Sequence, residues 1–255
     1  MKALFTLAVL AMTLSNFSPQ AAAAADTRCY EMRVYYSPQG KLDDLHARFR
    51  NHTLKLFAKH GMESIGYWVP MDNTENKLVF ILAYPSREAR EQSWKAFVAD
   101  PEWKEVAKKT EANGPIVAKV ETFFMTATDY SPSIKAVASG PRVFELRTYT
   151  ASPGNLAGLN ARFRNHTVKL FAKHGMTNFA YWDLMPDQKD ADKTLLYILG
   201  HASKAAADAS FKSFREDPDW VAARKASEEK AGGSLTAPGG VKSLFLVATD
   251  YSPTK

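Results

Sequence analysis

Residues 47–62 read ARFRNHTLKLFAKHGM, and residues 161–176 read ARFRNHTVKLFAKHGM. Only one of the 16 positions differs, Leu54 against Val168, and the two blocks lie 114 residues apart. Self-similarity at a fixed spacing is the signature of a structural repeat, and it decides the fold before any single motif is interpreted. The sequence therefore predicts two copies of one unit.

The two copies remain aligned on both sides of this block. Residues 30–33, YEMR, correspond to residues 144–147, FELR, at the same spacing of 114. The segment ATDYSP occurs at 127–132 and again at 248–253, where the spacing has grown to 121. Copy two therefore contains insertions, and we expect them in loops, including the glycine-rich stretch 232–240.

Each copy alternates between the hydrophobic periods of a strand and of a helix. In copy one the predicted elements are a strand at 28–36, a helix at about 41–60 ended by Gly61, strands at 64–70 and 77–84, a helical region that starts near Ser86 and restarts at Asp100–Pro101, and a strand at about 119–128. The order β-α-β-β-α-β is that of a ferredoxin-like unit. Its sheet carries helices on one face only, so the other face must be buried elsewhere. We therefore expect an α+β fold in which two tandem modules close a pseudo-dimeric α+β barrel.

The N-terminal residues have the pattern of a cleaved secretory signal: a lysine, a short apolar run and an alanine-rich tract with an A-x-A site. The apolar run is too short to span a bilayer, so we expect no transmembrane anchor and a periplasmic or secreted protein. The predicted organisation is a signal peptide at 1–25, a first domain at 26–132 (copy one), a linker at 133–141 and a second domain at 142–255 (copy two).

Charge and cysteine content exclude several functional classes. The chain has 33 Lys and Arg against 27 Asp and Glu, but the basic residues are scattered among acidic ones. We therefore expect no nucleic-acid partner and interpret the charge as an aid to solubility. The single cysteine, Cys29, cannot form a disulfide within the chain, and the sequence contains no CxxC metal motif.

Taken together, these motifs resemble the NIPSNAP family twice over. In copy one they are Tyr30-Glu31-x-Arg33, His52, His60-Gly61, Gly66-x-Trp68 and Asp100-Pro101-x-Trp103; in copy two they are Phe144-Glu145-x-Arg147, His166, His174-Gly175, Ala180-x-Trp182 and Asp217-Pro218-x-Trp220. The resemblance implies a dimeric α+β barrel and no established reaction. Superfamily relatives with this barrel include cofactor-free monooxygenases and haem-handling enzymes, but a shared fold does not carry function.

A histidine lies within the apolar stripe of each first helix. His52 follows Leu45 and Phe49 at helical spacing, and His166 occupies the same place in copy two, so both are expected to face the sheet. Each is either a core residue with satisfied nitrogens or an acid–base or haem-binding group. His52 and His60 lie about 12 Å apart along a helix axis, too far to share a metal ion, so we expect no metal site.

The first strand of each copy also has a polar face. In copy one it carries Glu31, Arg33 and Tyr35, and in copy two Glu145, Arg147 and Tyr149. We expect the apolar face to take the helices, which would turn these residues towards the barrel interior. They form either an internal salt-bridge network or a pocket in which arginine grips an anion. Trp68 and Trp182 follow Tyr67 and Tyr181, so one residue of each pair is expected to line the same cavity.

Three functional hypotheses follow. The first is a binding module for a small anionic or apolar ligand or for a partner. The second is a cofactor-independent monooxygenase-like enzyme that uses the barrel cavity, and the third is haem binding through a histidine. The first two require no cofactor, and no catalytic residue is assigned. The chain is expected to act as a monomeric pseudo-dimer or as a homo-oligomer.

Overall fold

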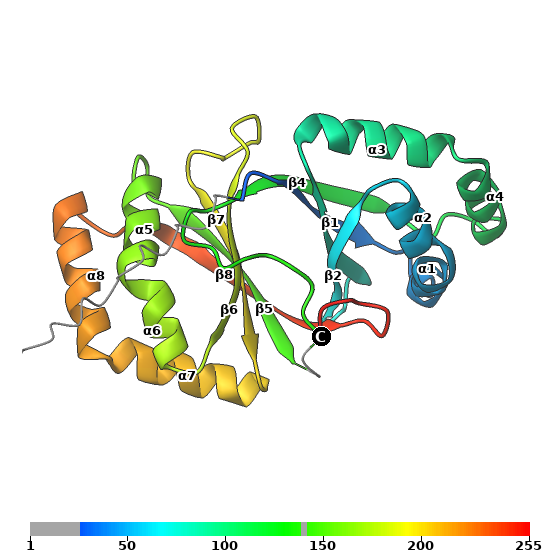
Figure 1. The fold of residues 1–255 in the computed structure, drawn as a ribbon. Helices are drawn as coiled ribbons and strands as arrows, with labels where there is room; N and C mark the ends of the chain where they lie inside the picture. Colours follow the sequence, from blue (N-terminus) through cyan, green and yellow to red (C-terminus); the bar gives the residue numbers. More distant parts are fainter. Residues whose placement is uncertain (1–25, 139–141) are drawn as a thin grey trace, which may run out of the picture.

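The computed structural model describes residues 26–138 and 142–255, so the predicted signal peptide and the end of the predicted linker lie outside the described residues. Within them, eight strands form one closed barrel in the order β1-β3-β2-β8-β5-β7-β6-β4. The strands are β1 Cys29–Tyr36, β2 Glu63–Pro70, β3 Lys77–Tyr84, β4 Lys119–Ala127, β5 Val143–Ala151, β6 Thr177–Leu184, β7 Thr194–His201 and β8 Thr236–Ala248. The helices of the two copies lie on opposite sides of this barrel (Figure 1).

Each copy has the predicted β-α-β-β-α-β order. The helices are α1 Leu42–Arg48, η1 Phe49–Thr53 (a π-helical turn), α2 Leu54–Lys59, α3 Arg87–Ala99 and α4 Pro101–Thr110 in copy one, and α5 Leu156–Arg162, η2 Phe163–Thr167 (also π-helical), α6 Val168–Lys173, α7 Lys204–Glu216 and α8 Pro218–Ala231 in copy two. The predicted break at Asp100 is confirmed, because its carboxylate accepts the amide of Glu102 at 2.8 Å and so caps α4. None of the helices in the described part of the chain is long and apolar enough to cross a membrane.

The chain closes the barrel without a second molecule. Copy one contributes β4-β1-β3-β2 and copy two contributes β8-β5-β7-β6. The copies join at two short seams, where β2 pairs with β8 and β4 pairs with β6 over three residue pairs each. Within a copy, β1 and β3 pair over eight. The seams between copies therefore need further contacts.

The repeated ATDYSP segments supply these contacts by reaching across to the other copy. The segment at 127–132 packs on copy two, where the backbone of Tyr181 forms two hydrogen bonds with it, both of 3.0 Å. The segment at 248–253 forms the same pair of bonds with Tyr67 of copy one, at 3.0 and 2.9 Å. This reciprocal exchange gives a structural reason for the segment to recur at the end of each copy.

Side chains from both copies fill the barrel interior. Tyr30, Trp68 and Trp182 are fully buried there, and Ile134, from the predicted linker, joins the same cluster. The apolar face of the first strand thus points into the barrel and not towards the helices, contrary to the sequence-based expectation. The reason is that a closed barrel excludes water completely, whereas the layer beneath the helices is open at its edges and tolerates charged groups.

The first helix of each copy also differs from the prediction. In a regular helix His52 would share a face with Phe49 and Leu56, but the π-helical turn η1 adds about one residue to a turn and shifts the phase. Thr53 is therefore buried, and His52 is exposed to solvent. The hydroxyl of Thr53 donates to the carbonyl of Arg48 at 3.2 Å within this turn.

The glycine-rich insertion of copy two is only partly a loop. Its second half begins β8, which is 13 residues long, whereas the corresponding β4 has nine. At Gly240 a Cβ atom would lie 2.7 Å from the carbonyl oxygen of Thr150, so the strand passes its neighbour closely enough to require glycine. The insertion therefore lengthens the sheet under the helices of copy two.

Candidate functional site

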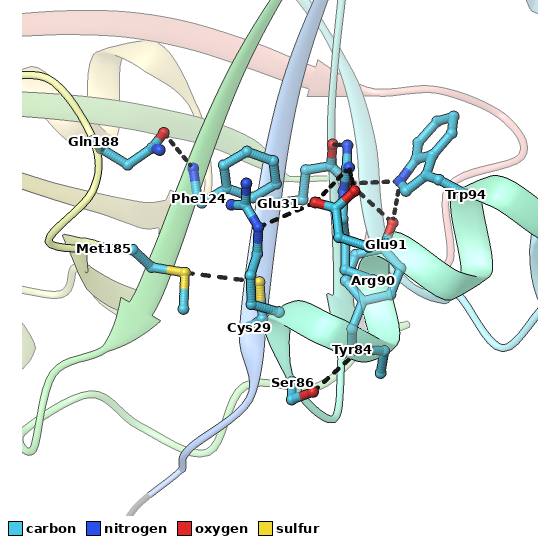
Figure 2. A network of polar contacts seen from close by, with 12 residues as sticks. Cys29, Glu31, Tyr84, Ser86, Arg90, Glu91, Trp94, Phe124, Met185 and Gln188 are labelled. Atoms are coloured by element: carbon cyan, nitrogen blue, oxygen red, sulfur yellow. Dashed lines mark hydrogen bonds and ion pairs between the residues drawn. The ribbon is translucent and has the colours of Figure 1, made fainter.

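In copy one the polar residues of β1 form a closed network beneath the helices. Glu31 is fully buried and accepts a hydrogen bond from Arg33 at 2.7 Å. It also accepts hydrogen bonds from Arg90 at 2.6 Å and from the indole of Trp94 at 2.8 Å (Figure 2). Burial alone would raise the pKa of Glu31, but the bonds from Arg90 and the charge of Arg33 outweigh it and lower the pKa. The expected inward orientation of Glu31, Arg33 and Tyr35 is thus wrong, and for Glu31 and Arg33 the salt-bridge interpretation describes copy one.

Copy two keeps the glutamate and the arginine but changes their surroundings. Glu145 binds Arg147 at 2.5 Å and His201 at 3.2 Å. Copy one has Arg90 and Trp94 on α3, whereas copy two has Ala207 and Phe211 at the corresponding positions of α7. Glu145, Arg147 and Tyr149 also lie beneath the helices and not inside the barrel. Ala207 and Phe211 are smaller than the arginine and the tryptophan that stand at these positions in copy one.

A pocket of about 230 Å³ lies in this layer of copy two, between β5 and the helices. Four of its lining residues are arginines, from β5, α5, α7 and α8: Arg147, Arg162, Arg215 and Arg224. Six others are aromatic: Tyr149, Phe163, Phe171, Phe211, Phe214 and Trp220. The one acidic lining residue is Glu228. The pocket thus combines a rigid apolar wall with an excess of positive charge.

The arginines of the pocket stack on its aromatic rings, and these contacts hold both in place. The guanidinium carbon of Arg147 lies 4.5 Å from the ring centre of Phe211, and that of Arg162 lies 5.2 Å from the ring centre of Trp220. Trp220 in turn packs on Phe214 at 4.4 Å between ring centres. Stacking on aromatic faces orients a guanidinium and leaves its edge free to donate hydrogen bonds.

One buried arginine of this pocket is poorly neutralised. Arg162 is 6 % exposed, and its nearest carboxylate oxygen, on Glu228, is 3.6 Å away. Its counterpart in copy one, Arg48, donates to Glu111 at 2.6 Å. The difference arises because Arg224 also binds Glu228, at 3.3 Å, whereas copy one has an alanine in its place. Burial lowers the pKa of Arg162, as expected for a cation with little compensation.

The pocket opens at the molecular surface. A wider depression of about 540 Å³ shares five lining residues with it: Arg215, Trp220, Arg224, Glu228 and Ser234. Arg215 forms no ion pair with any described residue. Ser234 and Thr236, which also line the pocket, belong to the segment that includes the insertion of copy two. A small solute therefore reaches the pocket past two exposed arginines.

Of the residues singled out in the sequence, Arg147 and Tyr149 line this pocket, and Glu145 supports it through Arg147. Arg162, Arg215 and Arg224 were missed. The signal that reveals two of them is a position-by-position comparison of the copies, because Val98 and Ala107 of copy one become Arg215 and Arg224 in copy two.

The other predicted residues lie apart from the pocket. Trp68 and Trp182 are buried in the filled barrel interior, where neither indole N–H has a hydrogen-bond partner. His166, like His52, is exposed, and it lines a groove of about 340 Å³ between α5 and α8. The barrel interior, where the enzyme hypothesis places its cavity, is thus lined by packed apolar side chains.

The histidines at the helix ends, His60 and His174, bind the carboxylates that cap the last helix of each copy. His60 contacts Asp100 at 2.7 Å, and His174 contacts Asp217 at 2.6 Å. These contacts tie the end of the first helix of each copy to the start of the last one. Nowhere in the described part of the chain do three or more His, Cys, Asp or Glu residues gather as a metal site would require.

Comparisons with known proteins agree with the fold. A candidate monooxygenase from Fusobacterium nucleatum superposes with a TM-score of 0.56 at 11% identity, covering 88% of this chain and 94% of that one. An anthrone oxidase-like protein gives 0.55 at 13% identity, covering 90% and 95%. At these identities the likeness shows a shared α+β barrel and nothing about activity.

The family itself is identified from sequence. An uncharacterised NIPSNAP-like domain protein from Burkholderia xenovorans is 19% identical, with 43% of this chain and 92% of that one covered and a TM-score of 0.39. No curated protein matches the chain. The family model named NIPSNAP matches residues 30–132 and again residues 144–253, which is most of the chain and both copies. The chain therefore belongs to the NIPSNAP family, with two NIPSNAP domains in tandem.

Proposed function

We propose that this protein is a small-molecule-binding module that holds an anionic ligand in the pocket of copy two. The observation that carries the proposal is the charge balance of that pocket. Four arginines and one glutamate line it, whereas the corresponding positions of copy one hold two arginines, Arg33 and Arg48, and one glutamate. Glu228 is shared by Arg162 and Arg224, so it cannot neutralise both. A bound anion would supply the missing negative charge.

The two copies then have different roles. In copy one, Arg48 is paired with Glu111 at 2.6 Å and Arg33 with Glu31 at 2.7 Å. Arg90 binds Glu91 as well as Glu31, so each of these arginines has a close carboxylate. We infer that both copies build the barrel and that copy two also carries the binding site.

We also propose that the protein acts outside the cytoplasm. Support comes from the signal-like pattern of residues 1–25. Expression of the full chain in a bacterial host, followed by cell fractionation and intact-mass measurement, tests this. A periplasmic product that begins at Asp26 is expected. A cytoplasmic product that retains the N-terminal segment would contradict it.

The binding proposal is tested by calorimetry with small organic anions and their uncharged amides. The decisive variant is Arg215→Val with Arg224→Ala, which restores the residues of copy one. Both arginines are exposed, so folding should be unaffected. A charge-assisted hydrogen bond contributes about 1.5–3 kcal/mol, so the loss of one should weaken anion binding roughly ten- to hundredfold.

The matched control removes two positive charges from copy one. Lys104→Ala with Lys108→Ala changes exposed residues of α4 and alters the net charge equally. Anion affinity should stay within about twofold of wild type at moderate ionic strength, where surface charges are screened. If the control weakens binding as much as the arginine variant does, binding reflects only net charge and the proposed site is wrong.

A further inference from the structure

The size and wall of the copy-two pocket restrict the anion it accepts, and this inference rests on the proposed function. A water molecule occupies about 30 Å³, so 230 Å³ holds roughly eight atoms or groups of that size. One six-membered ring with a single small substituent fits within this volume.

The wall of the pocket favours a flat apolar group. Phe171 lies 4.9 Å from Phe214 and 5.7 Å from Phe211 between ring centres, with one tilted and one edge-on arrangement. Phe163 and Phe171 are almost completely buried, so aromatic rings form part of the deep wall of the pocket. Aromatic rings pack on one another in offset or edge-to-face arrangements, and a planar ring therefore completes this wall.

The charged groups favour a single negative charge. Arg147 is neutralised by Glu145 at 2.5 Å, and Glu228 is divided between Arg162 and Arg224. Inside the pocket this leaves one poorly compensated guanidinium, that of Arg162, while Arg215 is open to solvent. The planar fork of a guanidinium matches a carboxylate in two parallel hydrogen bonds. A phosphate dianion would lose more hydration and would leave the aromatic wall uncovered.

We propose that the ligand of this pocket is a small planar aromatic carboxylate, with its ring against the phenylalanines and its carboxylate towards Arg162 and the rim arginines. The residue that selects for the ring is Phe211. Copy one has Trp94 at this position, where the larger indole stacks on the guanidinium of Arg33 at 4.3 Å. Phe211 therefore leaves space that the copy-one residue would fill.

Calorimetric titration of the purified protein with benzoate, benzamide, cyclohexanecarboxylate, acetate and inorganic phosphate tests this. Benzoate is expected to bind at least tenfold more tightly than each of the other four. In the variant Phe211→Trp, which carries the copy-one residue, benzoate affinity should fall to that of acetate, whereas acetate affinity should change less than threefold. Unchanged benzoate binding in this variant would overturn the proposal.

The remaining outcomes separate this inference from the proposed function. Equal affinity for benzoate and acetate, or tighter binding of phosphate, with loss of binding in the Arg215→Val and Arg224→Ala variant, would refute the aromatic carboxylate and retain the anion pocket. Binding of benzamide as tight as that of benzoate would assign an uncharged ring ligand and refute both. The absence of binding by every anion tested would also refute both.

Discussion

The strongest structural test of the pocket compares two equivalent arginines that differ in their distance from the nearest carboxylate. Arg48 and Arg162 occupy the same position in the two copies, are 4 % and 6 % exposed, and each lies 5.2 Å from the ring centre of a tryptophan. Arg48 has a carboxylate at 2.6 Å, whereas Arg162 has one only at 3.6 Å. Substitution of each by methionine removes the charge and keeps an unbranched side chain of helical preference.

The magnitude follows from these two distances. With an effective dielectric constant of about 20, lengthening an ion pair from 2.6 to 3.6 Å lowers its attraction by about 2 kcal/mol. The glutamates are 42 % and 25 % exposed, so solvent screening reduces this difference to about 1 kcal/mol. Arg48→Met should thus destabilise the protein more than Arg162→Met by about that amount. Replacement of a poorly paired buried charge by an apolar group is near neutral or stabilising.

Thermal unfolding followed by circular dichroism measures the difference. For a chain of this size, about 1 kcal/mol corresponds to a difference of roughly 2–4 °C in Tm. Benzoate at a hundredfold excess over its Kd should add about 2.7 kcal/mol of stability to wild type and to Arg48→Met, and much less to Arg162→Met. The reasoning is refuted if Arg162→Met loses as much stability as Arg48→Met, because Arg162 would then be a fully paired structural residue.

Three further predictions concern the barrel, the histidines and the helix caps. A Cβ on Gly66 would lie 2.1 Å from the ring of Trp68, so Gly66→Ala should lower the free energy of unfolding by about 1–3 kcal/mol through overpacking; an unchanged urea midpoint would contradict the position of the indole. His166→Ala should leave Tm unchanged, because the imidazole is exposed; loss of a hemin-induced Soret shift in this variant would support the haem hypothesis. Hydrogen bonds from the neighbouring lysine and histidine hold the pKa of Asp100 and Asp217 well below its usual range. Their contribution is therefore complete above about pH 4 and should decline as the pH falls further, and in a pH series of unfolding curves Asp217→Asn should show a smaller acid loss than wild type.

The fold was predictable because the repeat and the turn chemistry are local. Gly61 ends the first helical segment, and Ser86 and Asp100 cap the helices that follow them, each as the sequence predicts. Closure of the barrel followed from a sheet with one bare face in each copy. These inferences need only the hydrophobic period and the residues at the breaks.

The site was less predictable, because alternation along a strand separates two faces without saying which neighbour each face meets. Arg147 and Tyr149 were identified as candidates but were expected inside the barrel. His166 faces solvent because the helix contains a π-helical turn, whose extra residue shifts the positions that follow it around the helix axis. The sequence gives no sign of this shift, because its apolar residues still fit the regular helical period. The pocket itself depends on small differences between the copies, such as Trp94 against Phe211, whose meaning requires the three-dimensional superposition of the copies.

The two copies offer an internal reference for the central claim, that anion binding belongs to copy two. Trp103 and Trp220 are equivalent residues, and each packs on a phenylalanine at 4.4 Å between ring centres. Of the two, Trp220 lines the pocket. The chain has five tryptophans, so substitution by 5-fluorotryptophan gives five fluorine resonances that Trp→Phe variants can assign.

Fluorine NMR of this labelled protein during a benzoate titration is the most direct measurement. The resonance of Trp220 should shift and saturate, and that of Trp103 should stay in place throughout. Equal shifts of both resonances, or saturation of Trp103 alone, would contradict the assignment of binding to copy two, and the absence of any shift at saturating benzoate would contradict the pocket itself.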